Sequence, residues 1–104
     1  MAHPDDDAVF HALADATRRA LLDELAERAD QSLFELCTRL TMKHGIGSTR
    51  QAISQHLAVL EAAGLVESRR EGRCKLHRFN PRPLLAIVQR WPIPTEEPSP
   101  CGSS

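Results

Sequence analysis

The segment that decides the fold is residues 48–80, STRQAISQHLAVLEAAGLVESRREGRCKLHRFN. Its first half predicts a helix that begins after Thr49, because threonine oxygens commonly cap helix N-termini. Three apolar residues recur there at the i, i+4, i+7 spacing of one helix face: Ile53, Leu57 and Leu60. Gly64 then favours a stop, because glycine readily adopts the left-handed conformation that often follows a helix.

The second half of the segment predicts a β-hairpin. Two runs are typical of short strands, Leu65–Arg70 and Lys75–Phe79, and they are joined through Glu71-Gly72-Arg73-Cys74. Arginines and a lysine alternate, though not strictly, with apolar residues along both strands. An amphipathic helix followed by a basic hairpin is typical of proteins that place a helix in the DNA major groove and a wing beside it.

The residues before this segment are predicted to form three helices. The first follows the acidic run Asp5–Asp7, whose charge favours a helix N-terminus. Asp15 or Thr17 caps the second, which carries a broad apolar stripe. Ser32 starts the third, and Gly45-Ile46-Gly47 interrupts its pattern and marks a connection.

The chain is predicted to form one domain over residues 1–91. Its last helix, Leu84–Trp91, is opened by Pro81 and Pro83, because proline is favourable at a helix start. Residues 92–104, PIPTEEPSPCGSS, are too rich in proline and serine to pack, so a disordered tail is expected. The expected fold class is mostly α with a small β-hairpin, a winged helix-turn-helix in the order α-α-α-α-β-β-α.

Composition and charge narrow the function. The 104 residues are 41% hydrophobic and 26% charged, as in an ordinary globular domain. No apolar run approaches the roughly 18 residues that span a bilayer, and the acidic N-terminus does not fit a signal peptide, so we expect a cytosolic protein with no membrane partner. The net charge is −1, yet residues 48–90 carry eight cations and three acids, whereas residues 1–47 carry nine acids and five cations. This polarity fits a module that docks on phosphates through one face, with a solvated charged hairpin as the alternative.

The predicted partner is double-stranded DNA. Arginine can fork onto guanine and glutamine can pair with adenine, and recognition helices touch bases mainly with their N-terminal residues. The cations of the hairpin would contact phosphates or the minor groove, which supplies affinity and salt dependence more than sequence choice. The predicted DNA-binding residues are Thr49, Arg50, Gln51, Ser54, Gln55, His56, Arg69, Arg70, Arg73 and Lys75. The alternatives are the solvated face of an amphipathic helix and a hairpin whose charges only prevent aggregation.

Three motifs together resemble the ArsR/SmtB family of winged-helix transcriptional repressors over roughly residues 8–91. They are ATRRALLDEL, the pattern SxHLxVLEAAGLV at Ser54–Val66, and RREGRCKLHRFNP in the hairpin. The resemblance implies a homodimer, built from the first and last helices, on an imperfectly palindromic operator. On this sequence it points to Val9, Phe10, Leu13, Leu84, Leu85, Ile87, Val88 and Trp91. An apolar terminal helix on so small a domain independently favours a partner surface, with simple core packing as the alternative.

One segment departs from the family pattern. The family passes from its third helix to the recognition helix through a very short turn, whereas TMKHGIGS, residues 41–48, is several residues longer. A third helix that runs on to His44 would account for the extra residues. The insertion leaves the angle between the third helix and the recognition helix undetermined. It could also bring Lys43 or His44 to the phosphates of the DNA backbone.

The sequence predicts neither a metal site nor a cofactor. Many family members carry a thiolate pair in an ELCxC pattern, and Glu35-Leu36-Cys37 matches its start. Arg39 occupies the second sulfur position, however, and a guanidinium cannot ligate a metal. The family's other site, of His and acidic residues on the terminal helix, has no counterpart in LLAIVQRW.

Two other functions stay open as alternatives. One is a metal- or thiol-redox-responsive repressor that uses Cys37, Cys74 or His77, and the other is a winged helix that binds protein. An enzyme is not expected, because the chain has no glycine-rich phosphate loop, paired-carboxylate motif or nucleophile elbow. The sequence predicts no particular effector, small molecule or metal.

Overall fold

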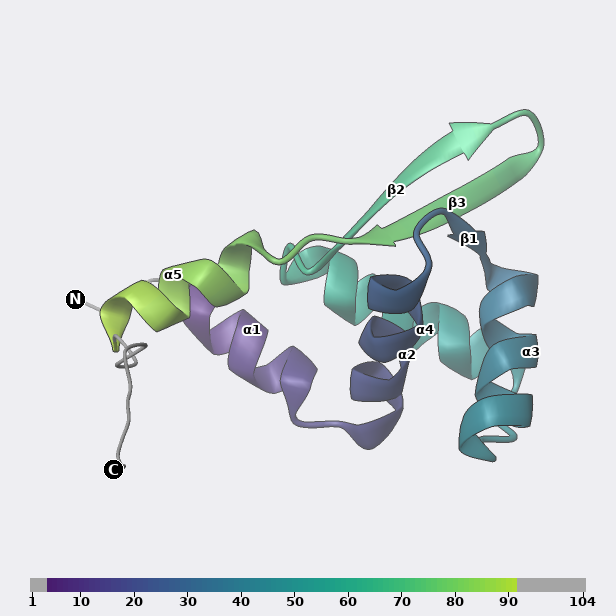
Figure 1. The fold of residues 1–104 in the computed structure, drawn as a ribbon, viewed down its shortest axis with the longest axis horizontal. Coiled ribbons are helices and arrows are strands. Elements are labelled where there is room, and N and C mark those ends of the chain that lie inside the picture. Colours follow the sequence, from purple (N-terminus) through teal and green to yellow (C-terminus); the bar gives the residue numbers. More distant parts are fainter. Residues whose placement is uncertain (1–3, 92–104) are drawn as a thin grey trace, which may run out of the picture.

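The structure, a computed structural model, describes residues 4–91 and has the predicted order of helices and hairpin (Figure 1). Its helices are α1 (Pro4–Leu13), α2 (Ala16–Glu27), α3 (Leu33–His44), α4 (Arg50–Ala62) and α5 (Arg82–Arg90). Its strands are β1 (Gln31–Ser32), β2 (Val66–Glu71) and β3 (Cys74–Phe79). The chain is therefore a mostly helical winged helix-turn-helix, as predicted. The predicted tail, residues 92–104, lies outside the described residues. Within residues 4–91 no helix is long and apolar enough to cross a membrane.

The ends of the helices follow local capping chemistry. The side chain of Asp15 caps α2 by accepting from the N–H groups of Thr17 and Arg18, so Asp15 and not Thr17 is the cap. Ser32 caps α3 through a reciprocal pair of hydrogen bonds with Glu35, a capping box. Thr49 Oγ1 accepts from the N–H of Ala52 at the start of α4, and Gly64 follows that helix with a φ of +79°. The last helix begins at Arg82, two residues earlier than expected.

Strand β1 was not predicted from the sequence. Gln31 pairs with His77 and Ser32 with Leu76, which makes a three-stranded antiparallel sheet in the order β1-β3-β2. Two residues are too few to show an alternating pattern, and Ser32 also serves as the helix cap. Gln31 is fully buried, and its side-chain amide donates to the carbonyl oxygens of Glu24 and Arg28 at the end of α2.

The apolar face of α4 is buried in the middle of the molecule. Ile53, Leu57 and Leu60 are 1%, 3% and 0% exposed. They share one core with leucines of α2 and α3: Leu21, Leu22, Leu25, Leu36 and Leu40. Each such side chain contributes roughly 1.5–3 kcal/mol when it is fully buried. This packing fixes the rotation of α4 about its own axis.

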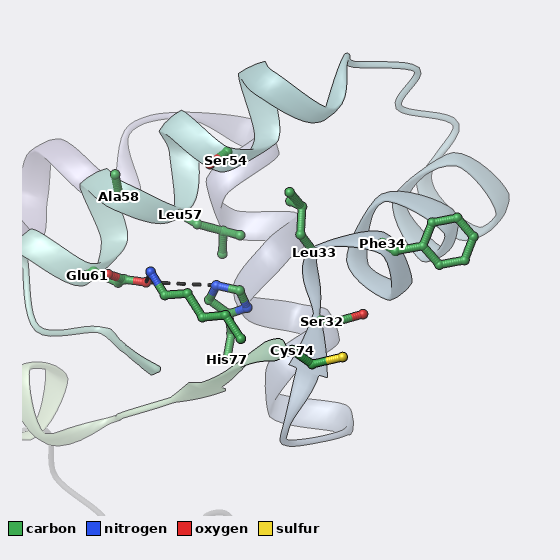
Figure 2. A pocket seen from close by; sticks show the side chains of 10 residues that line it. Ser32, Leu33, Phe34, Ser54, Leu57, Ala58, Glu61, Cys74 and His77 are labelled. Atoms are coloured by element: carbon green, nitrogen blue, oxygen red, sulfur yellow. Dashed lines mark ion pairs between the residues drawn. The ribbon is translucent and has the colours of Figure 1, made fainter. Parts of the chain in front are cut away.

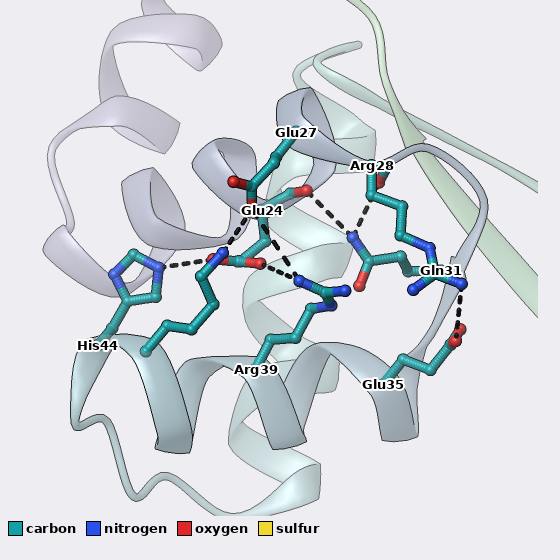
Figure 3. Close-up of polar contacts among 8 residues, drawn as sticks. Glu24, Glu27, Arg28, Gln31, Glu35, Arg39 and His44 are labelled. Carbon is teal, nitrogen blue, oxygen red and sulfur yellow. Dashed lines mark hydrogen bonds and ion pairs between the residues drawn. The ribbon is translucent and has the colours of Figure 1, made fainter.

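A buried carboxylate joins α2 to the C-terminal half of α3 (Figure 3). Glu24 is 2% exposed, and its oxygens lie 2.9 Å from His44 Nε2 and 3.3 Å from nitrogens of Arg39 and Lys43. Burial alone would raise the pKa of Glu24, but the hydrogen bonds from these three partners outweigh it and lower the pKa below its ordinary value. Lys43 also pairs with Glu27.

This cluster accounts for the long connection between α3 and α4. Helix α3 runs on to His44, and Gly45 ends it in the left-handed conformation with a φ of +66°. Lys43 and His44 point at the carboxylates of α2, so they form part of the α2–α3 contact. They are therefore not the free phosphate contacts that the sequence had suggested for them.

We expect Glu24→Gln to lower the free energy of unfolding by about 3 kcal/mol. Removing one partner of a buried ionic cluster leaves the others unpaired, and the value is at the low end because these partners partly reach solvent. Denaturant unfolding at pH 7 measures the change. Glu27→Gln is the matched control, and at a 60% exposed carboxylate it should cost no more than about 1 kcal/mol.

The pKa of Glu24 predicts how the stability of the fold depends on pH. Because the folded pKa of Glu24 is below its ordinary value of 4.5, its contribution is complete above that pH and is lost as the pH falls through the folded pKa. The stability of the wild type should therefore fall more steeply than that of Glu24→Gln below pH 4.5. Parallel curves for the two proteins would contradict this role for Glu24.

Candidate nucleic-acid interface

The N-terminal half of α4 presents a polar edge to solvent. Arg50, Gln51, Ser54 and Gln55 are all exposed, and Thr49 is exposed where it caps the helix. This orientation follows from the burial of Ile53 and Leu57 on the opposite face, since residues one or two positions apart point in different directions on a helix. The side chains with base-pairing donors and acceptors are therefore accessible, and no part of the described chain covers them.

An aromatic ring supports the first residue of this edge. The guanidinium carbon of Arg50 lies 5.6 Å from the centroid of the Phe34 ring. Phe34 belongs to the first turn of α3 and is 63% exposed, which is unusual for so large an apolar side chain. A cation–π contact at an exposed site contributes about 0.5–1 kcal/mol. Phe34 was not part of the predicted site, because only the fold brings α3 and α4 together here.

His56 differs from the other predicted residues of α4 because it faces the protein interior. It is half-buried, and its Nδ1 lies 3.2 Å from a guanidinium nitrogen of Arg18. Arg18 is itself buried, and it also donates to the carbonyl oxygens of His11 and Ala12 at the end of α1. Because a guanidinium can only donate, Nδ1 accepts and the proton of the neutral ring is on Nε2. His56 thus ties α4 to the end of α1.

The cations of the hairpin fall into two groups, and the first group is already paired. Arg69 lies 3.5 Å from Asp30 and 3.5 Å from Glu71. Lys75 lies 3.6 Å from Glu61, near the C-terminal end of α4. The contacts with Asp30 and Glu61 connect the hairpin to the rest of the domain, and all three contacts reduce the charge that Arg69 and Lys75 offer to an external partner.

The second group consists of arginines without an acid partner within residues 4–91. Arg70, Arg73 and Arg78 are exposed and form no ion pair there. Arg73 occupies the tip, after Gly72, whose φ of +63° suits the first central position of a two-residue hairpin turn. Arg70 lies opposite Lys75 in the strand register, whereas Arg78 lies on the other face of the hairpin. These three are the cations of the wing that no acid of the described residues neutralises.

Cys37, Cys74 and the wing histidine, His77, do not form a cluster suited to metal. Cys37 is half-buried on α3, and burial raises the pKa of its thiol although the charge of Arg50 opposes this. Cys74 is exposed on β3, whereas His77 is 4% exposed with Nδ1 3.0 Å from the carbonyl oxygen of Gln31. In the described part of the chain, no three His, Cys, Asp or Glu side chains come together at a site for a metal ion.

An apolar surface lies on α1 and α5, at the end of the molecule opposite the wing tip (Figure 1). No residue of α5 is fully buried. The large apolar side chains at this surface are between 42% and 55% exposed, and they are Phe10, Leu85, Val88 and Trp91. The rings of Phe10 and Trp91 lie 6.5 Å apart and join the two helices.

The other predicted interface residues are less accessible. Leu13, Leu84 and Ile87 are half-buried and pack against the core from its edge. Val9 is 1% exposed and belongs to the core of the single chain. Its side chain is already covered by its own domain, so Val9 is not part of the exposed apolar surface on α1 and α5.

Comparison with known proteins supports this description. Residues 13–69 match a family model described as a helix-turn-helix domain. The chain is 51% identical over 85 residues to an uncharacterized HTH-type transcriptional regulator of Bacillus subtilis, YuzN, covering 82% of this chain and 92% of that protein. It is also 33% identical over 73 residues to the arsenical resistance operon repressor of Escherichia coli, covering 70% of this chain and 57% of the repressor.

Two solved structures have a similar fold. An ArsR-like transcriptional regulator from Rhodococcus sp. RHA1 is 41% identical with a TM-score of 0.72, over 83% of this chain and 72% of that one. The homodimeric winged helix-turn-helix DNA-binding domain of Mb0332 from Mycobacterium bovis is 30% identical with a TM-score of 0.66, over 83% of this chain and 76% of that one.

Proposed function

Since this chain belongs to the ArsR family of helix-turn-helix transcriptional regulators, we propose that it represses transcription by binding an imperfectly palindromic operator as a homodimer. The family is one of DNA-binding regulators and not of enzymes. The observation that carries the proposal is the exposed polar edge of α4, held outward by its buried apolar face and flanked by a basic hairpin. We propose a cytosolic repressor that acts without a metal cofactor and blocks access of the polymerase to the operator.

In this proposal α4 and the wing make different kinds of contact with DNA. The edge of α4 reads bases in the major groove, with Arg50 held over Phe34 and with Gln51 and Ser54 in the next positions. The unpaired arginines of the wing, above all Arg73, bind phosphates or the minor groove. His56 acts through the helix, because its ring nitrogen is bonded to Arg18.

Dimerisation would use the apolar surface on α1 and α5. Large apolar side chains clustered on one face of a small domain favour a partner, and Trp91 is a natural anchor for such a surface. The similar domain from Mycobacterium bovis is described as homodimeric. A two-fold axis through this surface would place the two α4 helices in successive major grooves, about 34–36 Å apart.

Selection of bound DNA from a random pool tests the proposal. The wild type should enrich a palindrome whose half-sites are about 10–10.5 base pairs apart, centre to centre. Gln51→Ala should relax the preference at one position in each half-site, a loss of about 1–3 kcal/mol of discrimination. Gln89→Ala, at an exposed glutamine of α5, is the matched control and should leave the preference unchanged. A pool without any enriched sequence would refute sequence-specific binding.

The salt dependence of DNA binding tests the wing. Arg73→Ala should reduce the slope of log affinity against log salt by about 0.9, on operator and random DNA alike, because one phosphate contact is lost. Arg69→Ala removes the same charge from a side chain paired with Asp30 and Glu71. It should change the slope by less than half as much. Equal reductions in the two variants would show that the ion pairs do not matter for the contact.

Sedimentation of a surface variant tests the dimer. Leu85 is 55% exposed in the single chain, so Leu85→Asp should leave the fold intact and weaken dimerisation by at least about 2 kcal/mol. Met42→Asp is the control, because Met42 is 80% exposed on α3, away from the proposed interface. A Leu85→Asp protein that sediments like the wild-type dimer would place the interface elsewhere.

A further inference from the structure

A cleft of about 330 Å³ lies between α4 and β3, under the first turn of α3 (Figure 2). This volume is at the lower end of the range for small-molecule pockets, about 300–1,000 Å³. One wall of the cleft is apolar and includes Leu33, Leu57 and Ala58. One end is polar and includes Glu61, Lys75 and His77. In Figure 2 the side chains of Glu61 and His77 point toward one another across the cleft.

The polar end holds two acceptors that face each other without a donor hydrogen-bonded between them. The proton of neutral His77 is on Nδ1, because that nitrogen lies 3.0 Å from the carbonyl oxygen of Gln31, which can only accept. Nε2 is therefore an acceptor, and it lies 3.9 Å from Oε2 of Glu61. This distance is too long for a hydrogen bond, but one donor atom to the side of the pair can lie about 2.9 Å from both.

The charge of Glu61 is only weakly compensated. Glu61 is in the last turn of α4, where the helix dipole disfavours an acid. Its carboxylate accepts no hydrogen bond from the described residues, and the nearest ammonium, Lys75 Nζ, lies 3.6 Å away on a half-exposed side chain. Such an exposed ion pair contributes about 0–1 kcal/mol, so another cation can displace it at little cost.

We propose that this cleft binds a small primary amine with an apolar body. Its ammonium group would take the place of Lys75 and donate to both Glu61 and His77, since an ammonium has three donors. Its apolar body would pack against Leu33, Leu57 and Ala58. A carboxylate is excluded from the same position because it would face one carboxylate and one acceptor nitrogen.

The site couples to DNA through the lysine that the amine displaces, a consequence that rests on the proposed function. Lys75, once released from Glu61, becomes available to a phosphate. The amine therefore acts as a co-repressor, which raises the affinity for DNA and steepens its salt dependence by up to about 0.9 in slope. In Lys75→Ala the amine still binds, but this change in slope is lost.

Calorimetric titration of the full chain without DNA tests the site. Phenethylamine is the probe, and 3-phenylpropionate is a probe of similar size and opposite charge. Phenethylamine should bind in the millimolar range and 3-phenylpropionate should not. Glu61→Gln should weaken phenethylamine binding at least about tenfold, and Lys75→Ala should strengthen it because the competing ammonium is gone.

Glu67→Gln is the matched control. It neutralises an exposed acid on the neighbouring strand that does not line the cleft, so phenethylamine should bind it as it binds the wild type. Thermal unfolding verifies that each variant is folded. If Glu61→Gln does not fold, the stronger phenethylamine binding expected of Lys75→Ala still tests the site. No uptake of phenethylamine, equal uptake of both probes, or wild-type affinity in Glu61→Gln would overturn the inference.

A parallel titration with operator DNA separates the two proposals. A chain that binds the operator but takes up no phenethylamine would overturn only this inference. A chain that takes up phenethylamine but binds no DNA would overturn the proposed function and with it the co-repressor role, but not the amine site. Weaker operator binding in the presence of phenethylamine would overturn the co-repressor role.

Discussion

The burial of one face of α4 is the constraint on which the candidate interface depends. Ile53, Leu57 and Leu60 are together almost completely removed from solvent. Any rotation of the helix about its axis would expose some of these side chains and would bring Ser54 or Gln55 among leucines. Such a rotation would lose about 1.5–3 kcal/mol for each apolar side chain and would add the cost of burying polar groups without partners. The polar edge of α4 is therefore directed outward by the core and not by any contact of its own.

The Glu24 cluster adds a directional constraint that an apolar contact could not supply. Leucines tolerate sliding against one another, whereas a carboxylate buried under α3 is stable only where its three basic partners converge. Two of these partners, Lys43 and His44, are the last residues of α3. The long connection to α4 therefore starts from a fixed point. The extra residues lengthen α3 by an anchored turn and do not loosen the helix-turn-helix.

Sequence reasoning succeeded where the signal is local. The spacing of apolar residues identified α4, and the caps Ser32, Thr49 and Gly64 placed helix boundaries, because capping depends on neighbours in the chain. Features that depend on the tertiary structure could not be predicted from the sequence. Asp30 pairs with Arg69 across 39 positions of sequence, and strand β1 is too short to show a pattern. Adjacent residues of α1 point about 100° apart, and hydrophobicity alone could not tell that Val9 enters the core while Phe10 remains at the surface.

The ion pairs of the hairpin bear on DNA affinity as well as on architecture. Formal charge suggests a strongly basic surface over residues 48–90, but Arg69 and Lys75 are paired with acids of the same chain. Sequence-independent affinity comes from cations on phosphates, so each paired cation lowers the affinity for random DNA. Base contacts from α4 are unaffected by this pairing. On the proposed function, Asp30 and Glu61 therefore lower the affinity for operator and random DNA alike, and the choice of sequence rests on the base contacts of α4.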